Sequence, residues 1–251
     1  MELPEQQYLQ MQTKIYLACV RPLQEKEAFE RFYAEASPKR KEKICRYRYQ
    51  KDRLLSLGAD MLLRNALQEA GLMKPAPQGC EEPGVDPQTG REQWPVIAYG
   101  EQGKPYIAGA EGFHYNLSHD GEYVLLAVSD AEVGCDIEQI RPVDLKLPRH
   151  AFHPAEYERI AACAEAERDE LFFRYWVLKE SYIKALGTGL SEGLSSFCME
   201  FGDGICATVD GVPQPFGFAE GGDLPGYRYA VCRKGGLEEV TWETVDFRDF
   251  A

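Results

Sequence analysis

The stretch GCDIEQIRP, residues 134–142, places two acidic residues, Asp136 and Glu138, behind Gly134 with one residue between them. Side chains alternate across a β-strand, so these three residues are expected on one face and the intervening apolar residues on the other. The apolar face can pack on a core, while the opposite face presents two carboxylates about 7 Å apart. Hard divalent cations such as Mg²⁺ prefer such oxygens, often together with substrate phosphates. The segment is therefore either the polar face of a strand or part of a metal site.

A second stretch, FFRYWVLKESYIKALG, spans residues 172–187 and has the pattern of an amphipathic helix. Its large apolar side chains recur at helical spacing and are expected to be buried on one side; they are Phe172, Tyr175, Trp176, Ile183 and Leu186. Glu180 and Lys184 are four residues apart and share a face, with Lys179 beside them. The pair is either an ordinary surface ion pair, or a third metal carboxylate with lysines that neutralise a diphosphate.

The rest of the first half alternates helices and strands. Residues 14–20 are predicted as a strand, and SPKRKEK opens a helix with Ser37 as its N-cap and Pro38 at its first position. A second helix is expected over residues 53–72. Residues 73–111 are rich in Gly and Pro and are expected to form a surface loop or insertion. Strands and turns then alternate up to the acidic segment.

The second half repeats this order, with two helices predicted over residues 153–190 and strands after them. The predicted strands are 195–201, 207–211, 227–233 and 240–247. We therefore expect an α+β fold of two similar subdomains, residues 1–130 and 131–251, with a small-molecule site in the cleft between them.

Composition and charge restrict the classes of function. With 44% hydrophobic residues in a chain of 251, a globular protein is expected, and no apolar run approaches the roughly 18 residues of a membrane span. The net charge of −13 argues against general binding of nucleic acid. Residues 39–53 nevertheless carry eight basic and two acidic side chains, which fits either a solvated helix face or a site for the few phosphates of a small ligand. No secretory signal is recognisable, so a cytoplasmic protein is expected.

Cysteine and histidine residues give no zinc-binding pattern. The eight cysteines are scattered without a C-x-x-C pair and are expected to be free thiols. His150 and His153 precede Pro154, which indicates structural positions at a helix entrance. Ser118 and His119, in the turn NLSHDG, either bind phosphate oxygens or serve only the turn. The chain has no Walker loop and no G-x-G-x-x-G segment.

Two segments together resemble the signature of the 4′-phosphopantetheinyl transferases of the large, monomeric, surfactin-synthetase-activating type. They are VGCDIE and, about forty residues later, WVLKESYIKALGTGL. That signature is G-x-D-x-E followed by W-x-x-K-E-[SA]-x-x-K. The resemblance extends to SPKRKEK, GKP and NLSH and to the division into two halves, so it covers most of the chain.

The resemblance implies transfer of the phosphopantetheine arm of coenzyme A to a serine of an apo acyl or peptidyl carrier protein, with release of adenosine 3′,5′-bisphosphate. It also implies two subdomains about a pseudo-twofold axis, coenzyme A in the cleft, a dependence on Mg²⁺ or Mn²⁺, and a monomer. The basic segment then has a reason, because coenzyme A carries a 3′-phosphate as well as its diphosphate.

By motif position, the resemblance assigns roles to individual side chains. Asp136, Glu138 and Glu180 would hold the metal, Lys184 would stabilise charge as the leaving group departs, and these four are the implied catalytic residues. Either Glu180 or a water on the metal would remove the serine proton. The residues implied to contact coenzyme A are Arg40, Lys43, Lys104 (near the adenine), Ser118, His119, Lys179 and Lys184.

The sequence departs from the family's common pattern at two places. The loop over residues 73–95 is longer than is usual, which puts the adenine or carrier contacts in question. Leu55 stands where many members have an arginine that contacts a phosphate, and Arg53 is the available substitute.

Two other functions use the same residues. One is a Mg²⁺-dependent hydrolase that cuts the coenzyme A diphosphate with water, and the other is a non-catalytic module that binds coenzyme A or a carrier. The carrier's identity and the tolerance of acylated coenzyme A are left open. Because carriers are commonly acidic and this chain is acidic too, docking is expected to be largely apolar, through the turn segment after Tyr115 and the loops near Gly187 and Leu190.

Overall fold

The structure is a computed structural model, and it describes residues 13–73, 93–189, 193–237 and 239–250. The first half folds in the order β1 (Thr13–Cys19), a short helix η2 (Arg21–Gln24), α1 (Lys26–Glu35), α2 (Pro38–Arg46), α3 (Gln50–Glu69), β2 (Ile97–Tyr99), β3 (Pro105–Ile107), β4 (His114–Asp120), β5 (Tyr123–Ser129) and β6 (Val133–Gln139). The second half continues with α4 (Lys146–Ala151), α5 (Pro154–Ala162), α6 (Glu165–Leu186), η4 (Leu194–Ser196), β7 (Cys198–Phe201), β8 (Ile205–Val209), β9 (Val212–Pro213), β10 (Phe216–Gly221), β11 (Tyr227–Lys234) and β12 (Val240–Val245).

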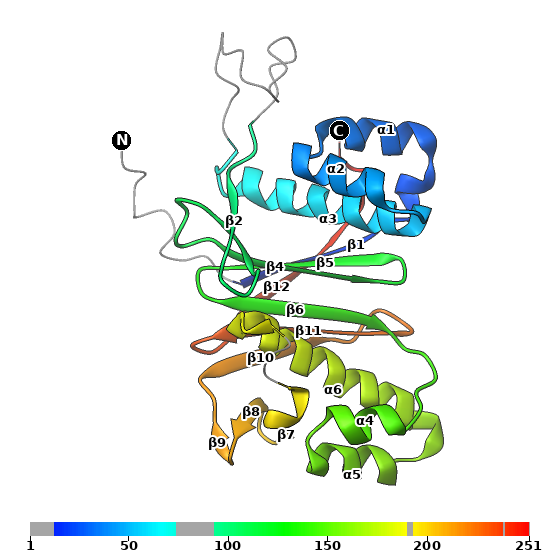
Figure 1. Ribbon diagram of the computed structural model, residues 1–251, viewed down its shortest axis with the longest axis vertical. Coiled ribbons are helices and arrows are strands. Elements are labelled where there is room, and N and C mark those ends of the chain that lie inside the picture. The colour runs from blue at the N-terminus through cyan, green and yellow to red at the C-terminus, as the bar shows by residue number, and fades with distance from the viewer. Residues whose placement is uncertain (1–12, 74–92, 190–192, 238, 251) are drawn as a thin grey trace.

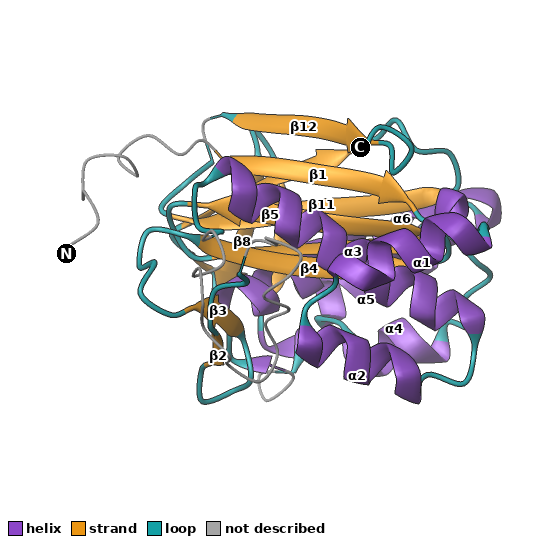
Figure 2. Ribbon diagram, turned by 90° about the horizontal axis from the view of Figure 1, so that it is seen from above, coloured by secondary structure: helices purple, strands orange, loops and turns teal. Residues whose placement is uncertain are grey.

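Two sheets lie in the middle of the molecule and helices cover their outer sides (Figure 1). The strand order is β12-β1-β5-β4 in the first sheet and β10-β11-β6 in the second. Helices α1–α3 lie over the first sheet and α4–α6 lie beyond the second (Figure 1). Seen from above, α3 runs along the strands of its sheet and α2 lies to one side of them (Figure 2). The predicted α+β fold class is confirmed, while the pseudo-twofold relation of the halves stays a prediction.

Apolar side chains from both sheets fill the space between them. They form one buried cluster of Ile15, Leu17, Leu125, Ala127, Val133, Cys135, Ile137, Tyr229 and Val231. Three of these come from β6, and they are the residues that alternate with the two acids of that strand. The predicted alternation of the acidic segment is therefore confirmed, because its apolar face packs into the core and its acidic face is turned the other way.

The last described strand departs from the predicted division at residue 130. β12 pairs in parallel with β1, with Lys14 opposite Thr241, and Val245 and Phe247 belong to the core under α1–α3. Residues 240–247 therefore belong structurally with the first half and not with the predicted C-terminal subdomain. The physical reason is that β1 is buried on both sides and pairs with a strand along each of its edges. The remaining division stays a prediction.

Several helix ends follow from local signals in the sequence. Ser37 caps α2 by accepting a hydrogen bond from the backbone N–H of Arg40 at 3.3 Å, and Pro38 occupies the first turn as predicted. In the second half of the chain, α6 ends at Leu186, and its C-cap is Gly187, whose φ of 73° is in the left-handed region. His153 caps α5 in a capping box with Glu156, so its predicted structural role is confirmed.

Other elements were not predicted from the sequence. The stretch predicted as a loop over residues 73–111 contains the hairpin β2–β3, although residues 74–92 lie outside the described residues. Helix α4 and strand β10 were also missed, and β10 completes the second sheet by pairing with β11. None of the described helices is both long and apolar enough to cross a membrane. All cysteines of the described ranges are free thiols, as predicted.

Candidate functional site

The crossing of α6 over β6 is set by a single glycine. A Cβ atom added at Gly134 would lie 2.1 Å from the carbonyl oxygen of Ser181 and 2.4 Å from the backbone nitrogen of Ala185. The absence of a side chain there lets the helix backbone rest directly on the strand. The helix consequently covers the face of β6 that carries the two acids, and it brings Glu180 and Lys184 over that face.

We expect Gly134→Ala to lower the free energy of unfolding by at least about 1–3 kcal/mol, because the methyl group must push α6 away from β6. Any activity that depends on this site should fall with it, since the side chains on α6 would move relative to those on β6. Urea unfolding followed by circular dichroism measures the first effect. Gly202→Ala is the matched control, because nothing lies within 4 Å of its added Cβ. Equal stability of the two variants would contradict the close packing.

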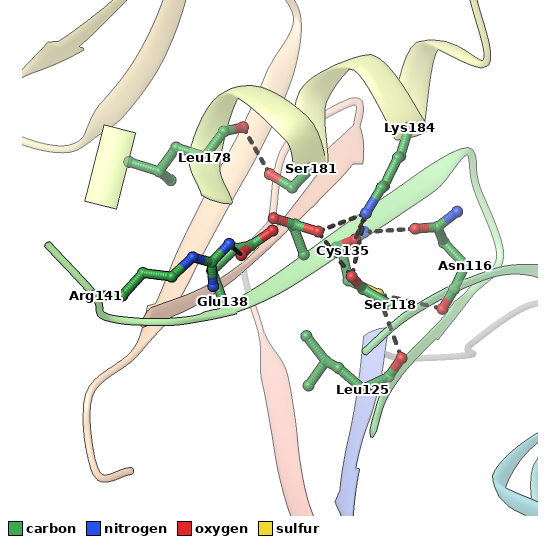
Figure 3. A network of polar contacts seen from close by, with 10 residues as sticks. Asn116, Ser118, Leu125, Cys135, Glu138, Arg141, Leu178, Ser181 and Lys184 are labelled. Carbon is green, nitrogen blue, oxygen red and sulfur yellow. Dashed lines mark hydrogen bonds and ion pairs between the residues drawn. The ribbon is translucent and has the colours of Figure 1, made fainter. Parts of the chain in front are cut away.

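A polar network joins Ser118 of β4, Cys135 of β6 and Lys184 of α6 (Figure 3). Asp136 takes part in it through contacts with Ser118 and Lys184. Its Oδ1 accepts hydrogen bonds from Lys184 Nζ at 2.5 Å and from Ser118 Oγ at 2.7 Å. Lys184 Nζ also donates to Ser118 Oγ at 3.2 Å and to the carbonyl oxygen of Cys135 at 3.3 Å. The second oxygen of Asp136, Oδ2, is buried and has no hydrogen-bond partner among the described residues. Such an oxygen is costly to bury unless a ligand completes its contacts.

Three carboxylates crowd around this network with one lysine among them. Burial, followed by the negative charges of Asp136 and Asp120, raises the pKa of Glu138 to about 7. Burial also raises the pKa of Glu180, where the charge of Asp136 adds to the effect and Lys184 opposes it. The three carboxylates share the site with two cations, Lys184 and the Arg141 guanidinium, which lies 3.0 Å from Glu138.

The predicted metal ligands are close, but they do not form a finished cage. In the described ranges, no three His, Cys, Asp or Glu side chains stand near enough together to hold a metal ion in their present positions. The donor set nevertheless fits a hard divalent cation, because all three groups are carboxylates and Asp136 Oδ2 lacks a partner. The ligand set Asp136, Glu138 and Glu180 stays a prediction.

We expect the pKa of Glu138 to make stability depend on pH when no divalent cation is present. The carboxyl ionises with a folded-state pKa of about 7 against an ordinary value of 4.5, so its stabilising contribution is present below about pH 4.5 and is lost as the pH rises through 7. Glu138→Gln removes this loss. In EDTA, the stability of Glu138→Gln relative to the unmodified chain should rise by about 2–3 kcal/mol between pH 4.5 and pH 8.

Urea titrations at a series of pH values measure that difference. Glu101→Gln serves as the control, because this glutamate is exposed on the turn between β2 and β3. A Glu138→Gln curve that runs parallel to that of the unmodified chain would show that Glu138 ionises normally.

Basic side chains gather beside the carboxylates. Desolvation lowers the pKa of His119, and the positive charges of Lys43, Lys184 and Arg40, which are near enough to act on the imidazole, lower it further. Arg40 is held in place by Asp60, whose Oδ1 accepts from Nε at 3.1 Å, while Lys43 is exposed. The predicted phosphate-contacting residues of α2 and of the β4 end are therefore brought together with the acidic residues in one place.

The predicted contact of Lys179 with coenzyme A needs correction. Its side chain is fully buried, and Nζ donates to Glu156 Oε1 and to the carbonyl oxygen of Phe197, each at 2.7 Å. Helix α6 is covered on more than one side, so neighbouring residues of the helix contact different parts of the protein. Lys179 ties α6 to α5 and to the start of β7, whereas Lys184 belongs to the Asp136 network.

Two further predicted contacts have partners within the protein. Lys104 forms an ion pair with Glu132 and donates to the carbonyl oxygen of Ala185 at 2.9 Å, which places it at the C-terminal end of α6. Its contact with the adenine stays a prediction. Arg53 Nε donates to the carbonyl oxygen of Tyr47 at 3.0 Å, so this side chain holds the turn between α2 and α3. Its role as a substitute phosphate contact stays a prediction.

The sequence analysis missed Arg141 and Asp120. Arg141 contacts Glu138 through Nη2 at 3.0 Å and Asp120 through Nη1 at 2.8 Å. The signal in the sequence was the position of an arginine three residues after the second acid of the motif. That spacing predicts no contact within an extended strand, but β6 ends at Gln139 and Arg141 lies beyond it.

Comparisons with known proteins agree with this site. A family model described as the 4′-phosphopantetheinyl transferase superfamily matches residues 132–230, which include β6 and α6. A 4′-phosphopantetheinyl transferase of Bacillus subtilis is 33% identical over 235 residues, covering 90% of this chain and 96% of its own. The 4′-phosphopantetheinyl transferase Sfp of Bacillus subtilis (strain 168) is 30% identical over 84% of this chain and 88% of its own. The 4′-phosphopantetheinyl transferase psf-1 of Bacillus pumilus is 37% identical over 53% of this chain and 58% of its own.

Proposed function

Because the chain belongs to the 4′-phosphopantetheinyl transferases, we propose that it transfers the 4′-phosphopantetheine arm of coenzyme A to a serine of an apo acyl or peptidyl carrier protein. The observation that carries the proposal is the Asp136 network. A buried carboxylate with one unpartnered oxygen lies beside two further carboxylates, and a group of cations stands next to them. This is the combination that a metal-bound diphosphate needs.

The reaction forms one bond and breaks another at a single phosphorus atom. The serine oxygen of the carrier attacks the phosphorus that bears the pantetheine, and the bond to the bridging oxygen of the diphosphate breaks. The electron pair leaves with adenosine 3′,5′-bisphosphate, and the serine proton passes to a base. Such a transfer depends on charge neutralisation and in-line positioning more than on covalent help from the protein.

The side chains of this chain can meet those demands. Lys184 is the side chain proposed to neutralise the negative charge that develops on the departing phosphate, and its ammonium group is held by Asp136 and Ser118. Either Glu180, whose carboxyl has a pKa raised by burial when no metal is bound, or a water on the metal is the proposed acceptor of the serine proton. Arg40, Lys43 and His119 are the proposed contacts for the remaining phosphates.

We propose that Asp136, Glu138 and Glu180 hold Mg²⁺ or Mn²⁺. A bound divalent cation would supply a Lewis acid that neutralises and orients the diphosphate oxygens. The proposal is supported by the unpartnered Oδ2 of Asp136 and by the raised pKa values of the other two carboxyls. A monomeric state and a cytoplasmic location stay predictions.

The test is the intact mass of an apo carrier after incubation with the protein, coenzyme A and Mg²⁺. A gain of one phosphopantetheine arm is expected, and it should be absent with EDTA or when the carrier's serine is changed to alanine. Loss of coenzyme A without any carrier would instead indicate a hydrolase of its diphosphate. Binding of coenzyme A without any reaction, across several carrier types, would indicate a binding module.

We expect carrier docking to be largely apolar, since both partners are acidic. Affinity for the carrier should then change little between low and high salt, whereas affinity for coenzyme A should fall as its phosphates are screened. Titration of each ligand by calorimetry at two salt concentrations separates the effects. Of the predicted surface, Tyr115 itself is buried and Leu190 lies outside the described residues. Loss of carrier binding at high salt would contradict the prediction.

A further inference from the structure

Arg141 follows β6 and is exposed, yet its guanidinium contacts two carboxylates, a backbone carbonyl and an aromatic ring. Its Nη1 donates to Asp120 Oδ2 at 2.8 Å and to the carbonyl oxygen of Gln139 at 3.2 Å, and its Nη2 donates to Glu138 Oε2 at 3.0 Å. The guanidinium also lies over the ring of Phe173, 5.1 Å from its centroid. Figure 3 shows it directly beside the Glu138 side chain.

The partners of Arg141 are themselves fixed. Asp120 ends β4, and its Oδ2 also accepts a hydrogen bond from the backbone N–H of Gln139 at 2.9 Å. Phe173 is a buried residue of α6. The guanidinium is therefore held by groups from β4, from the end of β6 and from α6, which are the three elements that build the Asp136 network.

The consequence falls on Glu138. One of its oxygens, Oε2, is held by Arg141, while Oε1 has no hydrogen-bond partner in the described part of the chain. A carboxylate fixed through one oxygen keeps a defined direction and leaves the other oxygen available. Groups that hold a ligating carboxylate in this way commonly govern how tightly a metal binds.

We propose that Arg141 is a positioning residue that fixes the carboxylate of Glu138 beside Asp136 so that it can hold the divalent cation. This inference rests on the proposed function, because it assigns Arg141 to the proposed metal site. It depends on the planar fork of the guanidinium, which spans two carboxylates at once. A lysine carries the same charge but cannot reproduce that geometry.

Charge and geometry make opposite predictions for the variants. If Arg141 acted only through its positive charge, it would repel a cation, and removal of the charge would tighten metal binding. If it positions Glu138, both Arg141→Met and Arg141→Lys should weaken metal binding by about tenfold or more. Asp120→Asn, which weakens the grip on the guanidinium, should weaken metal binding in the same direction.

The experiment measures Mn²⁺ binding directly. Free Mn²⁺ is followed by its electron paramagnetic resonance signal in titrations with protein and coenzyme A, without carrier, and Mn²⁺ held by coenzyme A alone is subtracted. Coenzyme A binding in EDTA is measured by calorimetry and should change less than about twofold, because Arg141 is assigned no contact with it. Arg149→Met is the matched control, since Arg149 is an exposed arginine of α4 that makes no contact with Glu138.

The outcomes separate the two proposals. The positioning role is overturned if Arg141→Met binds Mn²⁺ as tightly as the unmodified chain or more tightly. It is also overturned if Arg141→Lys binds Mn²⁺ with the affinity of the unmodified chain. In either case, arm transfer by the unmodified chain leaves the proposed function standing. No Mn²⁺ binding and no transfer by the unmodified chain overturn both. If Arg141→Met does not fold, as judged by its melting curve, Arg141→Lys and Asp120→Asn decide the matter.

Discussion

Asp136→Asn is expected to lower the rate of arm transfer to an apo carrier by at least about 100-fold, the scale of losing a main electrostatic contributor to a reaction. The substitution keeps the shape of the side chain but removes its charge. That charge is buried, accepts from Lys184 and Ser118, and leaves Oδ2 available for a cation. The measurement is the initial rate of mass gain on the carrier at saturating coenzyme A and Mg²⁺.

The control and a double variant sharpen this prediction. Asp203→Asn alters an exposed aspartate in the turn between β7 and β8 and should leave the rate unchanged. Asp136→Asn combined with Glu138→Gln should cost far less than the product of the two single effects, because groups that hold one ion act as a unit. A fully active Asp136→Asn variant would remove this residue from the site.

Lys179→Met is expected to cost about 3–5 kcal/mol of stability, because it leaves the carboxylate of Glu156 buried without its cation. Both side chains of the pair are fully buried, and Nζ and Oε1 are 2.7 Å apart. The backbone N–H groups of Met199 and His153 also donate to Glu156, at 2.7 and 3.0 Å, and they would remain. They soften the loss but do not balance a buried charge.

Replacing both partners shows how much of the loss comes from leaving one charge buried without its partner. The double variant Lys179→Met with Glu156→Gln should recover most of the stability that Lys179→Met loses, because no uncompensated charge remains and the amide oxygen still accepts a backbone hydrogen bond. Lys14→Met breaks a comparable but exposed pair with Glu69 and should cost less than about 1 kcal/mol. Urea unfolding of the four proteins tests this, and a Lys179→Met loss no larger than that of Lys14→Met would be inconsistent with a buried pair.

The parts of the site that lie close together in the sequence were predictable. The alternation in β6 and the spacing of Glu180 and Lys184 in α6 follow from the geometry of a strand and a helix, and both were found as expected. The position of Ser37 at the start of α2 follows from the hydrogen bond that its side chain can make.

The rest depended on contacts between distant segments. Lys179 and Glu180 are adjacent, and sequence alone could not show which of them is turned into the core, because α6 is buried on several sides. Glu156, the partner of Lys179, lies on another helix. The pairing of β12 with β1 and the grip of Asp120 on Arg141 likewise join residues whose proximity no local pattern records.

The parallel pairing of β1 with β12 has a consequence for biosynthesis. β1 is the first described strand to leave the ribosome, yet one of its two neighbours in the sheet is the last to be made. The first sheet therefore cannot be completed until β12 has been made, even after α3 and β5 have emerged. Such a distant contact also slows folding, since the intervening chain must be ordered first. A nascent chain stalled before residue 240 would thus leave one edge of β1 open until the C-terminal segment arrives.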